Sequence, residues 1–104
     1  MQAITPPRFI NVGGKRIPVH VLRDIPGCLG EYDSELRCIN LSADILKDRQ
    51  LFRDTLVHEV LHCALDLAGV SFNTSGVLSE KIEEQVVTAV ETLAAPAIIR
   101  VWRL

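Results

Sequence analysis

The chain has 104 residues, and 48% of them are hydrophobic, a length and composition that suit one compact domain around a single core. Eleven basic and thirteen acidic residues leave a formal net charge of -2. Because no block of like charge is present, the sequence argues against nucleic acid or an anionic membrane as a partner. We therefore expect one domain over residues 1–104.

The three cysteines, Cys28, Cys38 and Cys63, are an odd number without the close spacing of a metal-binding pair. They predict neither a disulfide framework nor a cysteine-based zinc site, which favours a reducing compartment. The first residues, MQAITPPRF, lack a charged leader followed by an apolar run, and no later stretch reaches the roughly 20 apolar residues of a membrane span. We expect a soluble protein of the cytoplasm.

Residues 8–23, RFINVGGKRIPVHVLR, predict a β-hairpin, because β-branched residues alternate with polar ones on both sides of a Gly13-Gly14 pair that suits a tight turn. Pro18 would remove one backbone donor from the second strand, so we expect that strand to be an edge strand or to be bulged there. Residues 24–33 contain one proline and two glycines and predict a turn or loop.

A third strand and two helices are predicted in the rest of the chain. Residues 36–41, LRCINL, favour a strand, and helical spacing of apolar residues over 48–68 predicts a helix that ends at Gly69. Ser79, followed by acidic residues in the first turn, predicts the start of a second helix that reaches Pro96. At this proline the helix either kinks and continues or ends.

The carboxy-terminal IIRVWRL is strongly apolar. We expect it to pack on the core with Trp102 as an anchor, the alternative being a contact with a second subunit. The order of the elements predicts a small strand layer packed on two helices, which is an α+β fold.

The first predicted helix contains HEVLH, in which His58 and His62 are four residues apart and therefore project from one face, one turn from each other. At this spacing two imidazole nitrogens reach one zinc ion, and Glu59, about 100° round the helix, is placed to take a proton from a zinc-bound water. The probability that a chain this short matches the H-E-x-x-H pattern by chance is below about one in a hundred. We therefore predict a zinc site.

A catalytic zinc ion usually has three protein ligands and a water. His20 lies on a predicted strand, and Cys63 points about 100° away from His62, so the second helix offers the better candidate. The apolar stripe of that helix centres near Glu83, which predicts Glu83 as the third ligand, with Glu80 on the flank of the stripe as the main rival.

On a helical wheel of the second predicted helix, Glu84 points away from the apolar stripe, toward Glu91. A carboxylate on the buried face needs a counter-charge, which a zinc ion supplies. The other interpretation is that Glu83 is an ordinary first-turn acid, stabilised by the helix dipole.

HEVLH, the stripe beginning at Glu83 and the order of the elements resemble the zincin metallopeptidases of the glutamate-ligand type, in particular the compact ImmA/IrrE-like proteins, many of them encoded by phages and mobile elements. In that family a Gly-aromatic-Asp turn and a short strand precede the metal helix, as GEYDSELRCINL precedes DTLVHEVLH here. A proline follows the glutamate ligand by thirteen residues, as Pro96 follows Glu83. The resemblance covers roughly residues 30–97.

The resemblance implies a zincin-like domain that hydrolyses peptide bonds of an intracellular protein substrate in a bacterial host cell. His58, His62 and Glu83 would hold Zn²⁺, and Glu59 would be the general base. The chain departs from the family at Leu61, where the family often has glycine. Val86 and Val87 stand where it often has Ala-Asn. These departures leave the subfamily and the substrate open.

Further roles follow for residues around the predicted site, each with a plain structural role as its alternative. Residues 37–41, RCINL, are a candidate edge strand for binding an extended peptide. Tyr32 and His20 are the available donors to a tetrahedral intermediate. Asp54 and Asp66, one turn from the paired histidines, could accept a hydrogen bond from a ligand imidazole.

Two other classes of function stay open. One is a zinc-stabilised, catalytically inactive protein-binding module on a zincin scaffold, and the other is a metal-free structural or virion protein. The presence of Glu59 favours the peptidase, because a module that only binds has no need of that base. The sequence leaves the oligomeric state undetermined.

Overall fold

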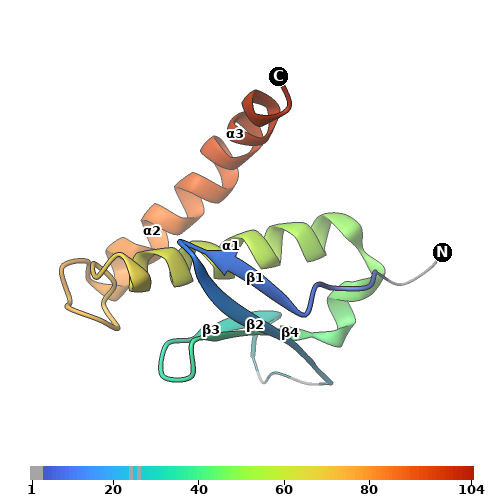
Figure 1. Cartoon of the computed structure of the whole chain (residues 1–104), viewed down its shortest axis with the longest axis horizontal. Helices are drawn as coiled ribbons and strands as arrows, with labels where there is room; N and C mark the ends of the chain where they lie inside the picture. The colour runs from blue at the N-terminus through green and yellow to red at the C-terminus, as the bar shows by residue number, and fades with distance from the viewer. Residues whose placement is uncertain (1–3, 24, 26) are drawn as a thin grey trace.

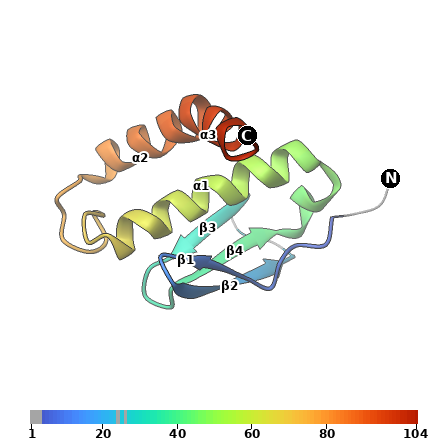
Figure 2. The ribbon, with the colours of Figure 1, turned by 45° about the horizontal axis from the view of Figure 1, so that its top comes forward.

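The computed structural model describes residues 4–23, 25 and 27–104. It is an α+β fold in which a four-stranded mixed sheet packs against helix α1 (Arg49–Leu67). A second helical unit, residues 80–102, follows in the chain. It packs on α1 from the side opposite the sheet, and α1 therefore lies between this unit and the sheet (Figure 1, Figure 2). The predicted fold class is confirmed at this level.

The predicted hairpin is formed by β1 (Phe9–Val12) and β2 (Lys15–Leu22), which pair antiparallel. Gly13 and Gly14 both have positive φ, 56° and 82°, as a tight hairpin turn of this twist requires. The expectation of an edge strand does not hold for β2 as a whole, which lies between β1 and β4, but Pro18 itself pairs only with β1. The proline is tolerated because the pairing of β2 with β4 begins one residue later, at Val19.

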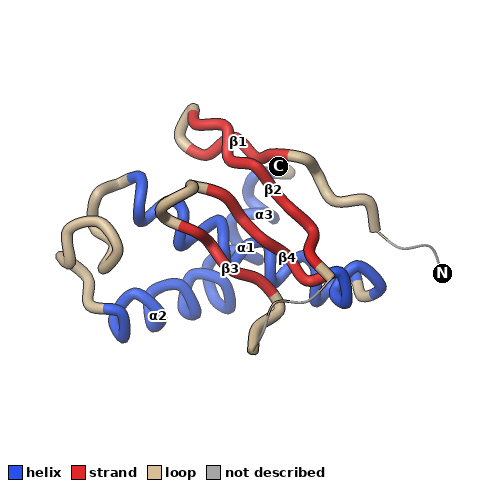
Figure 3. Tube along the Cα trace, turned by 90° about the horizontal axis from the view of Figure 1, so that it is seen from below, coloured by secondary structure: helices blue, strands red, loops and turns tan. Residues whose placement is uncertain are grey.

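The third predicted strand is β4 (Cys38–Ser42), and the sheet order β1-β2-β4-β3 makes it internal, as Figure 3 shows. The prediction that RCINL is an edge strand is therefore wrong. The edge position belongs to β3 (Gly30–Asp33), within the segment predicted as turn or loop. Asp24 and Pro26, in the first part of that segment, lie outside the described residues.

Helix α1 begins and ends where the sequence predicts. A 3-10 turn, η1 (Ala43–Lys47), precedes it, and the Asp48 side chain caps α1 by accepting a hydrogen bond from the Leu51 amide. At the other end Gly69 adopts φ 80°, a left-handed conformation that glycine takes without strain. The buried core lies between α1 and the sheet and comprises Ile17, Val19, Ile39, Leu41, Ile45 and Cys63.

Residues 80–102 form one helical unit, here called the C-terminal rod. Its segments are α2 (Glu80–Ala89), the π-helical turn η2 (Val90–Ala94) and α3 (Ala95–Trp102). In η2 the Ala95 amide bonds the Val90 carbonyl, five residues back. This widened turn just before Pro96 lets the helix continue past a residue without a backbone donor. Trp102 is 87% exposed, so its predicted role as a core anchor is wrong.

Candidate metal centre

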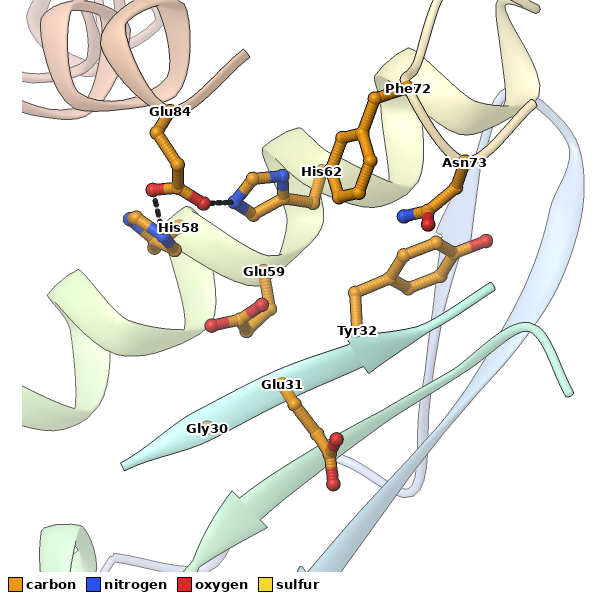
Figure 4. Close-up of a pocket in the computed structure, with 9 residues that line it drawn as sticks. All are labelled: Gly30, Glu31, Tyr32, His58, Glu59, His62, Phe72, Asn73 and Glu84. Carbon is orange, nitrogen blue, oxygen red and sulfur yellow. Dashed lines mark ion pairs between the residues drawn. The ribbon is translucent and has the colours of Figure 1, made fainter. Parts of the chain in front are cut away.

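His58 and His62 lie on the side of α1 that faces α2, with ring centroids 4.9 Å apart. Glu84 of α2 reaches both rings (Figure 4). Its Oε1 lies 2.7 Å from His62 Nε2, and its Oε2 lies 3.5 Å from His58 Nε2. The same ring nitrogen of each histidine is thus directed at one carboxylate.

These three side chains meet the geometric requirement for a shared metal ion. Within the described residues, ligand atoms of His58, His62 and Glu84 all lie within 4.8 Å of one another. Two imidazoles and a carboxylate are a donor set suited to zinc and related transition metals, and three protein ligands leave room for a further one.

The structure does not bring Glu83 into this group, and Glu84 takes the place predicted for it. Glu83 is 0% exposed. Its Oε2 lies 2.7 Å from His62 Nδ1, and its Oε1 accepts a hydrogen bond of 3.1 Å from the Phe72 amide. Glu83 therefore contacts the opposite edge of the imidazole from Glu84. The rival candidate, Glu80, is an exposed first-turn residue outside the group.

His58 has a matching partner on its other ring nitrogen. Glu91 of η2 places Oε2 2.9 Å from His58 Nδ1. Each imidazole therefore has one carboxylate at Nδ1 and shares Glu84 at Nε2. A carboxylate that accepts a hydrogen bond from Nδ1–H favours the tautomer in which the proton stays on Nδ1. Nε2 then carries a free lone pair, which is the form of the imidazole that binds a metal through Nε2.

The role that Glu83 and Glu91 fill was predicted for Asp54 and Asp66, and the structure places both of these elsewhere. Asp54 accepts hydrogen bonds from Gln50, one turn earlier in α1. Asp66 accepts hydrogen bonds from Tyr32 and Thr74. It thereby ties β3 and the loop after α1 to the end of that helix.

Glu59 lies between α1 and β3, next to the two histidines (Figure 4). It is 7% exposed, and in the part of the chain that the structure describes its carboxylate has no hydrogen-bond partner. Burial raises the pKa of Glu59, and the neighbouring His58 and His62 partly oppose that shift. The Glu59 carboxylate is therefore buried beside the three grouped side chains of His58, His62 and Glu84, and no described side chain forms a hydrogen bond with it.

A cavity of about 240 Å³ opens in front of these residues. Its lining combines the ligand group and Glu59 with three residues of β3 and two of the loop after α1, namely Gly30, Glu31, Tyr32, Phe72 and Asn73. A second cavity of about 410 Å³ shares Gly30, His58 and Glu59 with the first and is also lined by Leu29, Leu51 and Thr55. Glu59 thus lines both cavities, together with His58 and Gly30.

Neither predicted donor to a tetrahedral intermediate is free to act as one here. The Tyr32 hydroxyl donates a hydrogen bond of 2.5 Å to Asp66 Oδ2, although its ring lines the cavity. His20 is exposed on β2, where its Nδ1 lies 3.3 Å from Asn40 Oδ1. His20 is not among the residues that line the cavity at Glu59.

Sequence reasoning missed the carboxylates Glu84 and Glu91, although the chain carries a signal for them. They are seven residues apart, two helical turns, and so share one face of the rod. His58 and His62, four residues apart, also share one face. Two packed helices that each present a pair of such residues to the other can bring all four together.

Comparison with known proteins adds no family to this description: no family model, no curated protein and no solved structure matches the chain. Within the described residues, the helices lack the combination of length and apolar character needed to cross a bilayer.

Proposed function

We propose that this protein is a zinc-dependent metallopeptidase of the zincin type, with His58, His62 and Glu84 as the metal ligands and Glu59 as the general base. The observation that carries the proposal is the arrangement of the two imidazoles. Both direct Nε2 at Glu84, while Glu83 and Glu91 occupy Nδ1. A pair of histidines that merely decorated a helix would not require carboxylates at all of these nitrogens.

Zinc bound at this group would polarise a substrate carbonyl and lower the pKa of a water molecule to about 7. Glu59 supplies the proton transfers. Its buried carboxylate, with a raised pKa, accepts a proton from the attacking water, holds it beside the two histidines and delivers it to the leaving amine. Glu83 and Glu91 act through the histidines, because their hydrogen bonds keep both Nε2 atoms unprotonated.

The position of β3 supports a peptide as the substrate. Gly30, Glu31 and Tyr32 of this strand line the cavity at Glu59. In the described part of the chain β3 pairs only with β4, so its outer edge presents backbone donors and acceptors. An extended peptide that adds to this edge forms main-chain hydrogen bonds and passes in front of Glu59.

The test compares the zinc-loaded wild type with Glu59→Gln on a library of unstructured peptides. We expect cleavage by the wild type and a loss of about 100-fold or more in Glu59→Gln, with the zinc content unchanged. Glu80→Gln, on an exposed acid of the same rod, is the matched control and should cleave like the wild type. Equal cleavage by wild type and Glu59→Gln would contradict the mechanism, and zinc binding without cleavage by either would favour the inactive binding module.

A further inference from the structure

The second cavity at the metal centre, of about 410 Å³, contains residues that the proposed mechanism does not use. It shares Gly30, His58 and Glu59 with the cavity in front of the metal ligands. In the proposed peptidase, a peptide that passes in front of Glu59 therefore places a side chain next to the scissile bond at this second cavity. The rest of the lining decides which side chain fits there.

Part of the lining is apolar. Leu29, just before β3, and Leu51 of α1 contribute their side chains. Thr55 of α1 turns its Cγ2 methyl group toward Gly30, where a Cβ would lie only 2.8 Å from it. Because Gly30 has no side chain, it leaves this space free. Walls of this kind favour a substrate side chain with a hydrocarbon stem.

Asp54 adds a negative charge to the same cavity. It is partly buried and lies one turn before His58 in α1. Its carboxylate accepts hydrogen bonds of 2.9 and 3.1 Å from Gln50 Nε2, a neutral donor that leaves the charge in place. The ion pairs of the described residues do not include Asp54, and Arg53 lines a neighbouring cavity but not this one.

The two other carboxylates of this lining have partners or roles already. Glu91 Oε2 lies 2.9 Å from His58 Nδ1, and the buried Glu59 carries the proposed proton transfers. Among the described residues of the lining, Asp54 is therefore the acid that remains for a substrate group. The same lining contains neither lysine nor arginine, so a substrate cation is not repelled there.

The spacing along α1 suits a long basic side chain. Four residues separate Asp54 from His58, a rise of about 6 Å. The four-carbon stem of lysine carries its ammonium group about 6 Å from Cα. A lysine or arginine whose backbone lies at the metal centre can thus lay its stem against Leu29 and Leu51 and bring its charge to Asp54. An acidic side chain would meet a like charge instead.

We infer that this cavity is the specificity pocket of the proposed peptidase, on which the assignment rests, and that Asp54 selects a lysine or arginine next to the scissile bond. Asp54 determines specificity without contact to the reacting atoms. The substrate class is therefore a protein segment that is basic at the cleaved bond.

Cleavage of a random peptide library by the zinc-loaded wild type tests the pocket, with the cleaved bonds identified by mass spectrometry. At one of the two positions that flank the cleaved bond, we expect lysine and arginine to be enriched over aspartate and glutamate by at least about 5-fold. Cleavage without this preference would overturn the pocket and leave the peptidase standing. Absence of any cleavage would contradict both proposals.

Asp54→Asn tests whether this side chain is the cause of the preference. Asparagine keeps an oxygen that can accept from Gln50 but removes the charge. Two substrates carry lysine or norleucine at the selected position, because norleucine has the lysine stem without the ammonium group. We expect the ratio of their kcat/KM values, lysine over norleucine, to fall about 5- to 10-fold in Asp54→Asn. A partial loss of folded protein cancels in this ratio.

Asp44→Asn is the matched control, because Asp44 is an exposed acid of η1 that lines neither cavity. It should keep the wild-type ratio. In the wild type the ratio should also fall as the salt concentration rises, since salt screens the charge of Asp54. An unchanged ratio in Asp54→Asn, an equal fall in Asp44→Asn, or a ratio independent of salt would overturn the role assigned to Asp54.

Discussion

The fully buried carboxylate of Glu83 lies 2.7 Å from His62 Nδ1, on the opposite edge of the imidazole from Glu84. Two consecutive glutamates of one helix thus engage the two nitrogens of a single ring. Glu83 also accepts a hydrogen bond from the Phe72 amide, so the loop after α1 helps to fix its orientation. This division of roles makes the two neighbours separable by experiment.

Replacement of Glu83 by glutamine should weaken zinc binding without removing a ligand. The new amide group can donate to His62 Nδ1, which moves the ring proton to Nε2 and blocks the nitrogen that faces Glu84. We expect a loss of about 10- to 100-fold in zinc affinity, measured by competition with a chromophoric chelator. An unchanged affinity would contradict the role assigned to Glu83.

Replacement of Glu91 by glutamine should act on His58 in the same way but less strongly. The Glu91 side chain is partly exposed, so water can replace part of its hydrogen bond to Nδ1. The same competition assay should give a smaller loss of zinc affinity than for Glu83→Gln. A larger loss would show that Glu91 does more than orient the imidazole.

Gly30 marks a close approach between β3 and α1. A Cβ added there would lie 2.8 Å from Thr55 Cγ2 and 3.3 Å from Leu41 Cδ2. Gly30→Ala should therefore lower the free energy of unfolding by about 1–3 kcal/mol, as measured by urea denaturation. Thr55→Ser removes the contacting methyl group, so the double variant should recover part of that loss, a coupling that a double-mutant cycle detects. Strictly additive effects would contradict the predicted contact.

The hydrogen bond from Tyr32 to Asp66 predicts a pH-dependent stability. Burial, and then this bond, raise the pKa of Tyr32 well above its ordinary value of about 10. Because the folded state disfavours the ionised phenol, this contribution is fully present below about pH 10 and is lost as the pH rises further. Tyr32→Phe should therefore destabilise by about 1–2 kcal/mol at neutral pH. The difference from the wild type should shrink in urea denaturation above pH 10, and a constant difference would contradict the assignment.

Local patterns were sufficient for the elements whose own residues determine them. The Gly13-Gly14 turn, the cap at Asp48 and the glycine at Gly69 define their turns and helix ends through backbone conformation alone. Strand β3 was missed because its four residues begin with Gly30 and follow Pro26 and Gly27 in the sequence, a composition typical of a turn. Its strand conformation depends on pairing with β4 and packing on α1, which are tertiary contacts.

Which glutamate lies between the two histidines depends on how the second helix is rotated about its axis relative to α1. A helical wheel of the second helix alone does not give that rotation. The apolar stripe of the second predicted helix includes Val87 and Leu93. Its centre was taken as the direction that faces α1, yet Leu93 is exposed whereas Val87 is fully buried. The π-helical turn η2 also shifts the face that the rod presents beyond Ala89. An error of one residue, Glu83 for Glu84, is a rotation of about 100°.

The most direct test of the account is a calorimetric titration of zinc into the metal-free wild type, Glu84→Ala and Glu80→Ala. Glu80 is the control, because it lies on the same helix but outside the ligand group. We predict about one zinc per chain for the wild type and Glu80→Ala, and a large loss of affinity for Glu84→Ala. A wild type that takes up no zinc, or a Glu84→Ala variant that binds it like the wild type, would contradict the assigned metal centre.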